Sequence, residues 1–373
     1  MLERWITSQE RRRLARDTNR RVLPFEWGLE YIEARNGSDD PRRILDEYVD
    51  WAMQNSEEFF HHTSTADYQF DGRQLTYPSQ IQTPYPENNT VFARYYPSKH
   101  LTSRAKIRPA VIVMPQWNGD FDAHVALAQL FARFGISALR LSMPYHDSRK
   151  PPHLERSDYM VSSNIGRTLQ ASRQAVLDVK RAADWLLGQG FNRIAVMGTS
   201  IGSSVAFLTF AHDPRFAAGI FNHGSSYFGD VVWTGITTQH VRQGIESHLT
   251  QDQLRRYWSP ISPFPFIRRL NQNPRKMLIV SAEYDLSFLP CFSQDVFREY
   301  RSHGIPFELQ LMPCGHYTLG TFPFSWWVAG RMVRFLRRHL LSIPAGSRDL
   351  PGNARDATPG RPEWVDDRTP PQV

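Results

Sequence analysis

The spacing of apolar positions separates an N-terminal segment from the rest of the chain. Over residues 1–64 polar side chains dominate, and the apolar residues Ile44 and Tyr48 lie one helical turn apart. Asp40 and Pro41 precede them, a pair typical of the first turn of a helix. We therefore predict that residues 1–64 form a helical extension that docks onto a larger domain.

Residues 65–341 show the alternation of strands and helices expected of one α/β domain. Two short runs, 74–77 and 90–96, predict antiparallel strands at its start. Beyond them, continuous apolar runs typical of strands buried on both faces alternate with segments of helical period. The predicted strands are residues 110–114, 136–141, 194–197, 216–221, 277–282 and 307–312, and the predicted helices are 123–134, 168–187, 201–212, 291–302 and 326–341. This order predicts βαβ units and a mostly parallel central sheet flanked by helices.

Two segments interrupt or end this alternation. Residues 223–274 form an insertion rich in His, Gln and Trp, which we expect to be a helical cap over the carboxyl edge of the sheet. Residues 342–373 are rich in Pro, Gly, Asp and Arg and have no periodicity, so we expect a disordered tail there.

Charge and cysteine content restrict the function classes. The formal net charge is +7, but the basic residues are dispersed among acidic ones, which speaks against a nucleic-acid partner. A peripheral contact with a membrane surface stays compatible with this charge. Cys291 and Cys314 are too few for a disulfide scaffold and lack a metal-binding spacing. The sequence shows neither a signal peptide nor a bilayer-spanning apolar run, so we expect a cytoplasmic location.

The strongest chemical signal is a G-x-S-x-G sequence formed by residues 198–202. It stands between a predicted buried strand and a predicted helix, the context in which such a serine becomes a nucleophile. Ser200 must occupy a sharply turned backbone there, and Gly198 and Gly202 leave room for neighbouring chain. We therefore predict Ser200 as the nucleophile.

A nucleophilic serine needs a general base and an acid that orients the base. Asp285 follows the predicted strand 277–282 and is our candidate acid; Glu283, which lies nearer to the strand, is the competitor. His316 follows the last predicted strand and is the candidate base. His303 at a helix end and His339 inside a basic helix resemble ordinary solvated histidines.

The negative charge that forms on the carbonyl oxygen needs two backbone N–H donors, the oxyanion hole. Ile201 follows the nucleophile at a helix N-terminus and is expected to supply one of them. The loop after the strand 110–114 is expected to supply the other, from Trp117 or, as the second choice, from Gln116.

With these residues in the order Ser200, Asp285, His316, the chain resembles the α/β-hydrolase superfamily over residues 70–341. Many members have His-Gly before the oxyanion residue, whereas this chain has Pro115-Gln116.

A narrower resemblance rests on residues 143–151, followed by a long helix and the G-x-S-x-G sequence. This arrangement is similar to the abhydrolase-domain family numbered eighteen. That family has Pro-Tyr-Tyr-Gly where Pro144-Tyr145-His146-Asp147 stands here. The resemblance names no substrate.

Further residues suggest how a substrate is held. His146, Asp147, Arg149 and Lys150 follow a predicted strand, so they either line the pocket and bind an anionic group or form a solvated loop. Aromatic residues of the insertion are expected to form a lid-like wall for an apolar acyl or aryl group: Tyr227, Phe228, Trp233, Tyr257, Trp258, Phe264 and Phe266.

The predicted function is hydrolysis of a carboxylic ester or thioester through an acyl-enzyme, with a small-molecule or lipid acyl ester as substrate and without metal or cofactor. Peptidase or acyltransferase chemistry on the same triad is the first alternative, because the fold does not fix the reaction. A non-catalytic binding protein of the same fold is the second.

Overall fold

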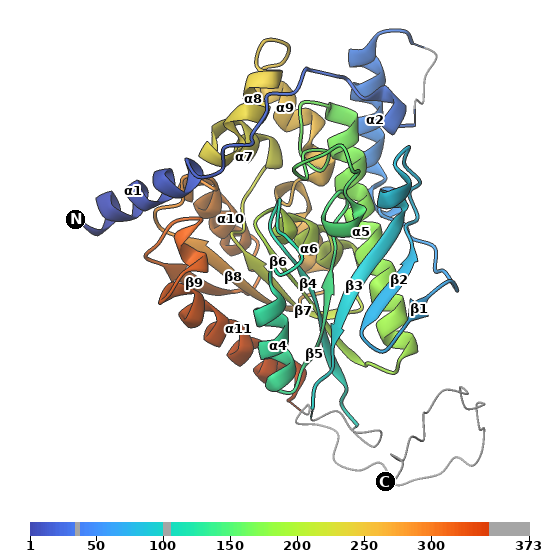
Figure 1. Ribbon diagram of the computed structural model, residues 1–373, viewed down its shortest axis with the longest axis vertical. Coiled ribbons are helices and arrows are strands. Elements are labelled where there is room, and N and C mark those ends of the chain that lie inside the picture. The colour runs from blue at the N-terminus through green and yellow to red at the C-terminus, as the bar shows by residue number, and fades with distance from the viewer. Residues whose placement is uncertain (34–37, 100–105, 343–373) are drawn as a thin grey trace, which may run out of the picture. The chain divides into compact units, whose positions relative to one another are not determined.

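A central sheet organises the computed structural model, which describes residues 1–33, 38–99 and 106–342. Within these ranges the sheet has nine strands in the order β1-β2-β3-β5-β4-β6-β7-β8-β9 (Figure 1). The strands are β1 (Gln69–Phe70), β2 (Gln74–Pro78), β3 (Thr90–Tyr96), β4 (Pro109–Met114), β5 (Ser137–Leu141), β6 (Arg193–Thr199), β7 (Phe216–Asn222), β8 (Lys276–Ala282) and β9 (Glu308–Met312).

The direction of the strands changes between β3 and β5. Strands β1, β2 and β3 pair antiparallel, and β3 pairs antiparallel with β5. From β5 through β4, β6, β7 and β8 to β9 all pairs are parallel. The carboxyl ends of these six strands therefore share one edge, where loops of an α/β sheet build binding sites. The predicted antiparallel entry to a mostly parallel sheet is confirmed.

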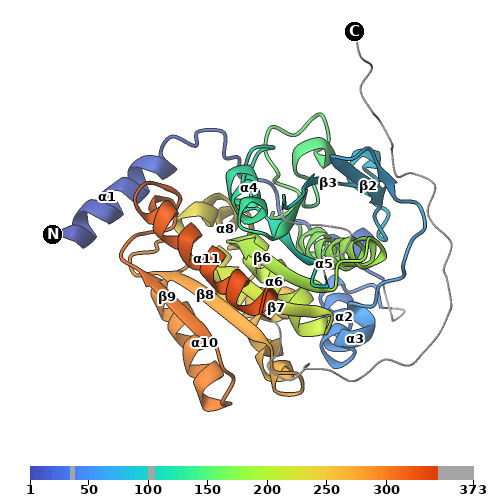
Figure 2. The same ribbon diagram turned by 90° about the horizontal axis from the view of Figure 1, so that it is seen from below.

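Helices cover both faces of the sheet, as the alternation of periods predicts. One face is covered by α5, α6 and α10, and the other by α4 and α11, which lie side by side (Figures 1 and 2). Buried apolar residues on both faces of the sheet explain the continuous apolar runs of its central strands. The bounds are α4 (Val125–Arg133), α5 (Ile165–Gly188), α6 (Ile201–His212), α10 (Pro290–Ser302) and α11 (Phe324–Leu340).

The described part of the N-terminal segment contains three helices: α1 (Leu2–Leu14), α2 (Pro41–Gln54) and α3 (Ser56–Phe59). As predicted, α2 begins at Pro41, and the side chain of Asp40 accepts a hydrogen bond from the backbone N–H of Arg42. Residues of α2 join the core with α5, whereas α1 contributes Ile6 to the core under α11. The predicted disordered tail lies, from residue 343, outside the described residues.

The insertion between β7 and β8 is helical. Figure 1 shows its helices grouped near α2 at one end of the sheet. They are α7 (Phe228–Thr234), α8 (Gln239–Ile245) and α9 (Gln251–Tyr257). The described residues also form 3-10 helices: η1 (Leu29–Tyr31), η2 (Pro86–Asn89), η3 (Asp147–Arg149), η4 (Ile236–Thr238), η5 (Ser259–Ile261), η6 (Phe264–Asn271) and η7 (Thr318–Gly320). Across the described ranges, no helix combines the length and the apolarity that crossing a bilayer requires.

Candidate active site

Ser200 stands in the sharp turn between β6 and α6. Its backbone has φ 57° and ψ −124°, a conformation that costs a non-glycine residue about 1–3 kcal/mol. The turn is possible because the residues at positions 198 and 202 are glycines. A Cβ on Gly198 would overlap the carbonyl of Gly202, and a Cβ on Gly202 would overlap the carbonyl of Pro115. The turn therefore holds the Ser200 hydroxyl above the carboxyl edge of the sheet.

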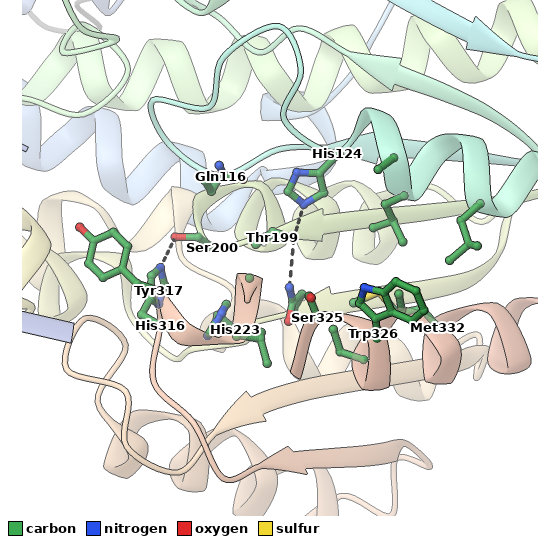
Figure 3. Close-up of a pocket in the computed structure, with 18 of the residues that line it drawn as sticks. Gln116, His124, Thr199, Ser200, His223, His316, Tyr317, Ser325, Trp326 and Met332 are labelled. Carbon is green, nitrogen blue, oxygen red and sulfur yellow. Dashed lines mark hydrogen bonds between the residues drawn. The ribbon is translucent and has the colours of Figure 1, made fainter. Parts of the chain in front are cut away.

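The structure brings the three predicted triad residues together. The hydroxyl oxygen of Ser200 lies 3.1 Å from Nε2 of His316 (Figure 3). Nδ1 of the same imidazole lies 2.9 Å from Oδ2 of Asp285. Ser200 follows β6, Asp285 follows β8 and His316 follows β9, so loops at one edge of the sheet carry the set.

The carboxylate of Asp285 is buried and saturated with donors. Its Oδ1 accepts hydrogen bonds from the backbone N–H groups of Ser287 and Phe288 at 2.8 and 2.7 Å. Burial alone would raise the pKa of Asp285, but interactions with His316 and His223 hold it well below its ordinary value. Asp285 is therefore a fixed negative charge. In the described part of the chain, the carboxylate of the competitor Glu283 makes no hydrogen bond to either histidine.

A second histidine, His223, shares this carboxylate, and the sequence reasoning missed it. Nδ1 of His223 lies 2.9 Å from Oδ2 of Asp285, and the ring centroids of His223 and His316 are 4.2 Å apart. His223 directly follows β7, so a position at the end of a parallel strand was the available signal. Because Nδ1 of His223 faces a carboxylate, its N–H lies there and Nε2 is left as an acceptor.

The two histidines on Asp285 have opposite pKa shifts. Burial lowers the pKa of His223, and the nearby His316 lowers it further. Burial also opposes the charged form of His316, but the charge of Asp285 outweighs it and raises the pKa of His316 above its ordinary value. Of the two histidines, the one with the raised pKa takes up a proton more readily, so His316 is the one suited to act as the base.

The other candidate histidines lie elsewhere, as expected. His303 pairs with Glu299 on the same helix, and His339 pairs with Glu308. Cys314 is buried. Burial is the main cause, and the negative charge of Asp285 the second, that raises the pKa of the Cys314 thiol to about 12. The thiol therefore stays protonated and is a poor nucleophile.

The loop expected to carry the second oxyanion donor lies beside Ser200. Gln116 and Trp117 both line the cavity, and Figure 3 shows Gln116 next to Ser200. The indole of Trp117 donates to the carbonyl of Ser157 at 2.9 Å, which fixes its side chain. Ile201 is the first residue of α6, so its N–H lacks a partner within the helix.

His146 holds the loop after β4 by a hydrogen bond and does not line the cavity. Its Nε2 accepts a hydrogen bond from the backbone N–H of Asn118 at 2.9 Å, and its Nδ1 faces the carbonyl of Pro144. Burial lowers the pKa of His146 to about 4, so the imidazole is neutral and can accept this bond. Asn118 has φ 58°, a left-handed conformation that this bond helps to hold.

Asp147, Arg149 and Lys150, the other members of the predicted anion-binding group, bond to protein groups and do not line the cavity. The buried carboxylate of Asp147 pairs with Arg140, which also donates to the carbonyl of Asp120 in the same loop. Arg149 pairs with the buried Asp178 at 2.8 Å. Lys150 bonds a backbone carbonyl. None of the four predicted residues is among those lining the cavity, so the predicted pocket wall is wrong. The predicted solvated loop fits Lys150, whose bond is exposed, but not the buried His146 and Arg149.

Helix α1 reaches the loop that carries His316, a contact that the sequence did not reveal. The fully buried carboxylate of Glu10 accepts hydrogen bonds from the backbone N–H groups of Tyr317 and Thr318, both at 2.9 Å. A Cβ on Gly315 would overlap Glu10, which explains the glycine before His316. The charge of Glu10 also contributes to the raised pKa of His316.

One cavity of 1180 Å³ contains Ser200 and His316. Asp17 and Arg20 of the N-terminal segment line one part of it, and the guanidinium of Arg20 donates to the Tyr317 hydroxyl at 2.9 Å. Helices α4 and α11 line another part. The extension therefore forms part of the wall.

The prediction that aromatic residues of the insertion form a lid over the site is wrong, because none of the seven lines the cavity. Trp258 is completely buried, packs on Phe228 with ring centroids 5.5 Å apart, and donates its indole N–H to the carbonyl of Ile165. The ring of Trp233 lies under the guanidinium of Arg242. From the insertion only His223 and Thr237 reach the cavity. The helices sit near the predicted edge, but their rings pack into the core.

Within the described ranges, one group has the composition of a metal site: His223, Asp285 and His316, whose ligand-type atoms lie within 4.8 Å of one another. Both imidazoles direct Nδ1 at the carboxylate, where each donates a hydrogen bond. A protonated nitrogen has no lone pair for a metal, so this arrangement is that of a hydrogen-bonded acid–base group.

The comparisons with known proteins agree with this fold. Residues 166–340 match the model of the prolyl oligopeptidase family, peptidase S9. No curated protein matches the chain. Among solved structures, the acylaminoacyl peptidase of Pyrococcus horikoshii is similar, with a TM-score of 0.57 and 13% identity over 74% of this chain and 43% of that one.

Two further structures are similar at comparable levels. A puromycin-hydrolysing peptidase of Mycobacterium tuberculosis has a TM-score of 0.54 and 16% identity, over 69% of this chain and 38% of that one. Acetyl xylan esterase 1 of a Thermoanaerobacterium species has a TM-score of 0.54 and 14% identity, over 80% of this chain and 99% of that one. This chain thus spans less than half the length of either peptidase. The fold is the α/β-hydrolase fold, as predicted.

Proposed function

We propose that this protein is a serine hydrolase that cleaves a carboxylic ester or thioester through an acyl-enzyme. The observation that carries the proposal is the continuous hydrogen-bonded chain from the Ser200 hydroxyl through His316 to Asp285. A strained serine turn and a base with a raised pKa support it, because both are features of activated nucleophiles.

Each residue has a defined role in the proposed reaction. Ser200 Oγ attacks the carbonyl carbon while its proton passes to Nε2 of His316, and the imidazolium that forms is stabilised by Asp285. His316 then gives this proton to the leaving alcohol or thiol. Water attacks the acyl-enzyme with His316 again as base, which releases the acid and restores Ser200.

The oxyanion of both tetrahedral intermediates is proposed to lie between Ile201 N–H and a donor from the loop after β4. Trp117 N–H is the proposed second donor and Gln116 N–H the alternative. The support is the position of this loop beside Ser200 and the rigid hydrogen bonds of His146 and Trp117 behind it. One such donor typically contributes on the order of 10²–10³ in turnover.

Peptide-bond cleavage on the same triad is the second candidate, favoured by the match of residues 166–340 to the prolyl oligopeptidase family. Esters are proposed first because helices α4 and α11 give the cavity a largely apolar wall suited to an uncharged acyl group. The narrower similarity to the abhydrolase-domain family numbered eighteen stays a hypothesis on residues 143–151.

A fluorophosphonate probe tests the proposed function directly. We expect wild-type protein to be modified at Ser200, as located by mass spectrometry of its peptides, and the Ser200→Ala variant to remain unmodified. Paired p-nitrophenyl esters and p-nitroanilides with the same acyl group then separate esterase from peptidase activity. An unmodified Ser200 in folded protein would contradict both candidate functions and favour a binding protein.

A further inference from the structure

One arm of the active-site cavity leads away from Ser200 between helices α4 and α11. Both helices lie on the same face of the sheet and contribute residues to the cavity that contains Ser200. In Figure 3, side chains from α4 point toward α11, where Trp326 and Met332 lie opposite them. His124, at the start of α4, bonds Thr199 at 2.8 Å, so the arm begins beside the nucleophile. We call this arm the α4–α11 groove.

The walls of the groove are apolar because each helix turns one face toward it. On α4 and just beyond its end, Leu127, Leu130 and Phe134 occupy positions i, i+3 and i+7, which lie on one side of a helix. On α11, Ala329 and Val333 are spaced by four residues and face the cavity in the same way. Seven residues of helical rise give the groove a length of about 10 Å.

Parts of these walls are uncovered. Trp326 is 77% exposed and Phe134 is 40% exposed, although both line the cavity. The charged residues that line this arm, among those described, are Arg334 and Arg337 in the last turns of α11, and the Arg337 guanidinium lies 5.9 Å from the Phe134 ring centroid. Polar side chains of His124, Thr199 and Asn222 line the start of the arm beside Ser200. Between them and the arginines the described lining is mainly apolar, and apolar surface gains free energy when a ligand covers it.

We propose that the α4–α11 groove binds an extended hydrocarbon chain of the substrate, roughly eight carbons long from the length of the helical wall. The inference rests on the proposed function, because the groove and the nucleophile belong to one cavity, so a molecule that reacts with Ser200 can fill both. The chain belongs either to the acyl group or to the alcohol of the ester, and both sources have the same chemistry.

Alkyl fluorophosphonates of graded length test this inference without knowledge of the natural substrate. Ser200 Oγ attacks phosphorus, fluoride leaves, and the serine proton passes to His316, so the rate of modification reports on binding beside the nucleophile. One series lengthens the alkyl group on phosphorus, in the acyl position, and a second lengthens the alkoxy group, in the alcohol position.

We expect the second-order rate constant to rise in one series by about fourfold per methylene, equivalent to about 0.8 kcal/mol, and to level off near eight carbons. The series that rises identifies whether the acyl or the alcohol side occupies the groove. Equal rates at all lengths in both series would overturn the inference.

Filling the groove provides the second measurement. A Cβ on Gly330, which lines the cavity from α11, would meet no atom within 4 Å, so Gly330→Leu inserts a side chain into open space. Leucine also favours helix more than glycine does, so the variant should fold. We expect the ratio of octyl to methyl reaction rates to fall at least tenfold. Gly188→Leu is the matched control, because Gly188 is a helical glycine in equally open space on α5 and away from the cavity.

The outcomes separate the two proposals. If Ser200 reacts but Gly330→Leu keeps the dependence on chain length, the groove inference is wrong and the proposed function stands. If chain length matters only when lipid vesicles are present, the apolar walls contact a membrane and the inference is again wrong. If Ser200 reacts with no member of either series, the proposed function fails together with the inference.

Discussion

The two halves of the candidate active site are held in place by different forces. On the nucleophile side, Ser200 is fixed by backbone packing, since Gly198 and Gly202 allow contacts that no side chain would permit. On the acid–base side, His316 and His223 are fixed by hydrogen bonds to one buried carboxylate, Asp285. The first half leaves no room for added side-chain volume. The second depends on the charge of Asp285.

The largest expected effect comes from the nucleophile itself. Ser200→Ala removes one hydroxyl from a turn whose shape is set by backbone, so the fold should be kept while turnover falls on the order of 10⁶-fold. The measurement is ester turnover together with thermal unfolding. A variant that keeps most of its turnover would remove Ser200 from the mechanism.

The next effect should come from charge. Asp285→Asn keeps the shape of the side chain but loses the negative charge that orients and stabilises His316, and turnover should fall on the order of 10⁴-fold. Glu283→Gln is the matched control and should be close to wild type, because no bond joins Glu283 to either histidine in the described structure. The reverse pattern would show that Glu283 is the acid.

Added volume should damage the nucleophile side. In Gly202→Ala the new Cβ overlaps the carbonyl of Pro115 and must displace the loop that carries Gln116 and Trp117. We expect a loss of about 1–3 kcal/mol in the free energy of unfolding and roughly 10²-fold in turnover. Urea unfolding and ester kinetics measure both, with Gly188→Ala as control. Unchanged kinetics would mean that the position of this loop is not needed for catalysis.

The smallest effect should come from His223 and should depend on pH. Because the pKa of His316 is raised, activity should fall as the pH drops through a value above about 6.5, where His316 becomes protonated. His223→Leu removes one donor from Asp285, whose charge then acts more strongly on His316. The acid limb of kcat/KM should therefore move to higher pH, with a loss of about tenfold at neutral pH.

His223→Gln is the matched variant, because its amide can donate to Asp285 without a ring. It should restore the position of the acid limb. If both variants have the wild-type pH profile, His223 only fills space beside the triad.

The sequence was sufficient for those features that depend on local pattern. Continuous apolar runs predicted the buried strands. The glycines around Ser200 predicted a tight turn, because close contacts between backbone atoms require residues without a side chain. Asp285 and His316 could be selected by their positions after strands, since parallel strands end at one edge.

Features that depend on distant contacts were not predictable in this way. Asp285 meets His223 across 62 residues, and Glu10 meets Thr318 across 308, with no local pattern to mark either pair. The aromatic residues of the insertion were misread because burial in a core and exposure to a substrate require the same apolar side chains. Trp258 satisfies its polar N–H on a backbone carbonyl, a partner that composition does not show.

The contact of Glu10 with the loop of His316 has a consequence for the order in which the protein is made. Glu10 is synthesised 308 residues before its partner Thr318. At about 5–20 residues per second this separation corresponds to roughly 15–60 s of synthesis. Within that time Ser200 is synthesised and its turn can form, but His316, the residue whose loop Glu10 contacts, is not yet part of the chain. The proposed triad therefore cannot assemble in the nascent chain until the loop of His316 has been synthesised.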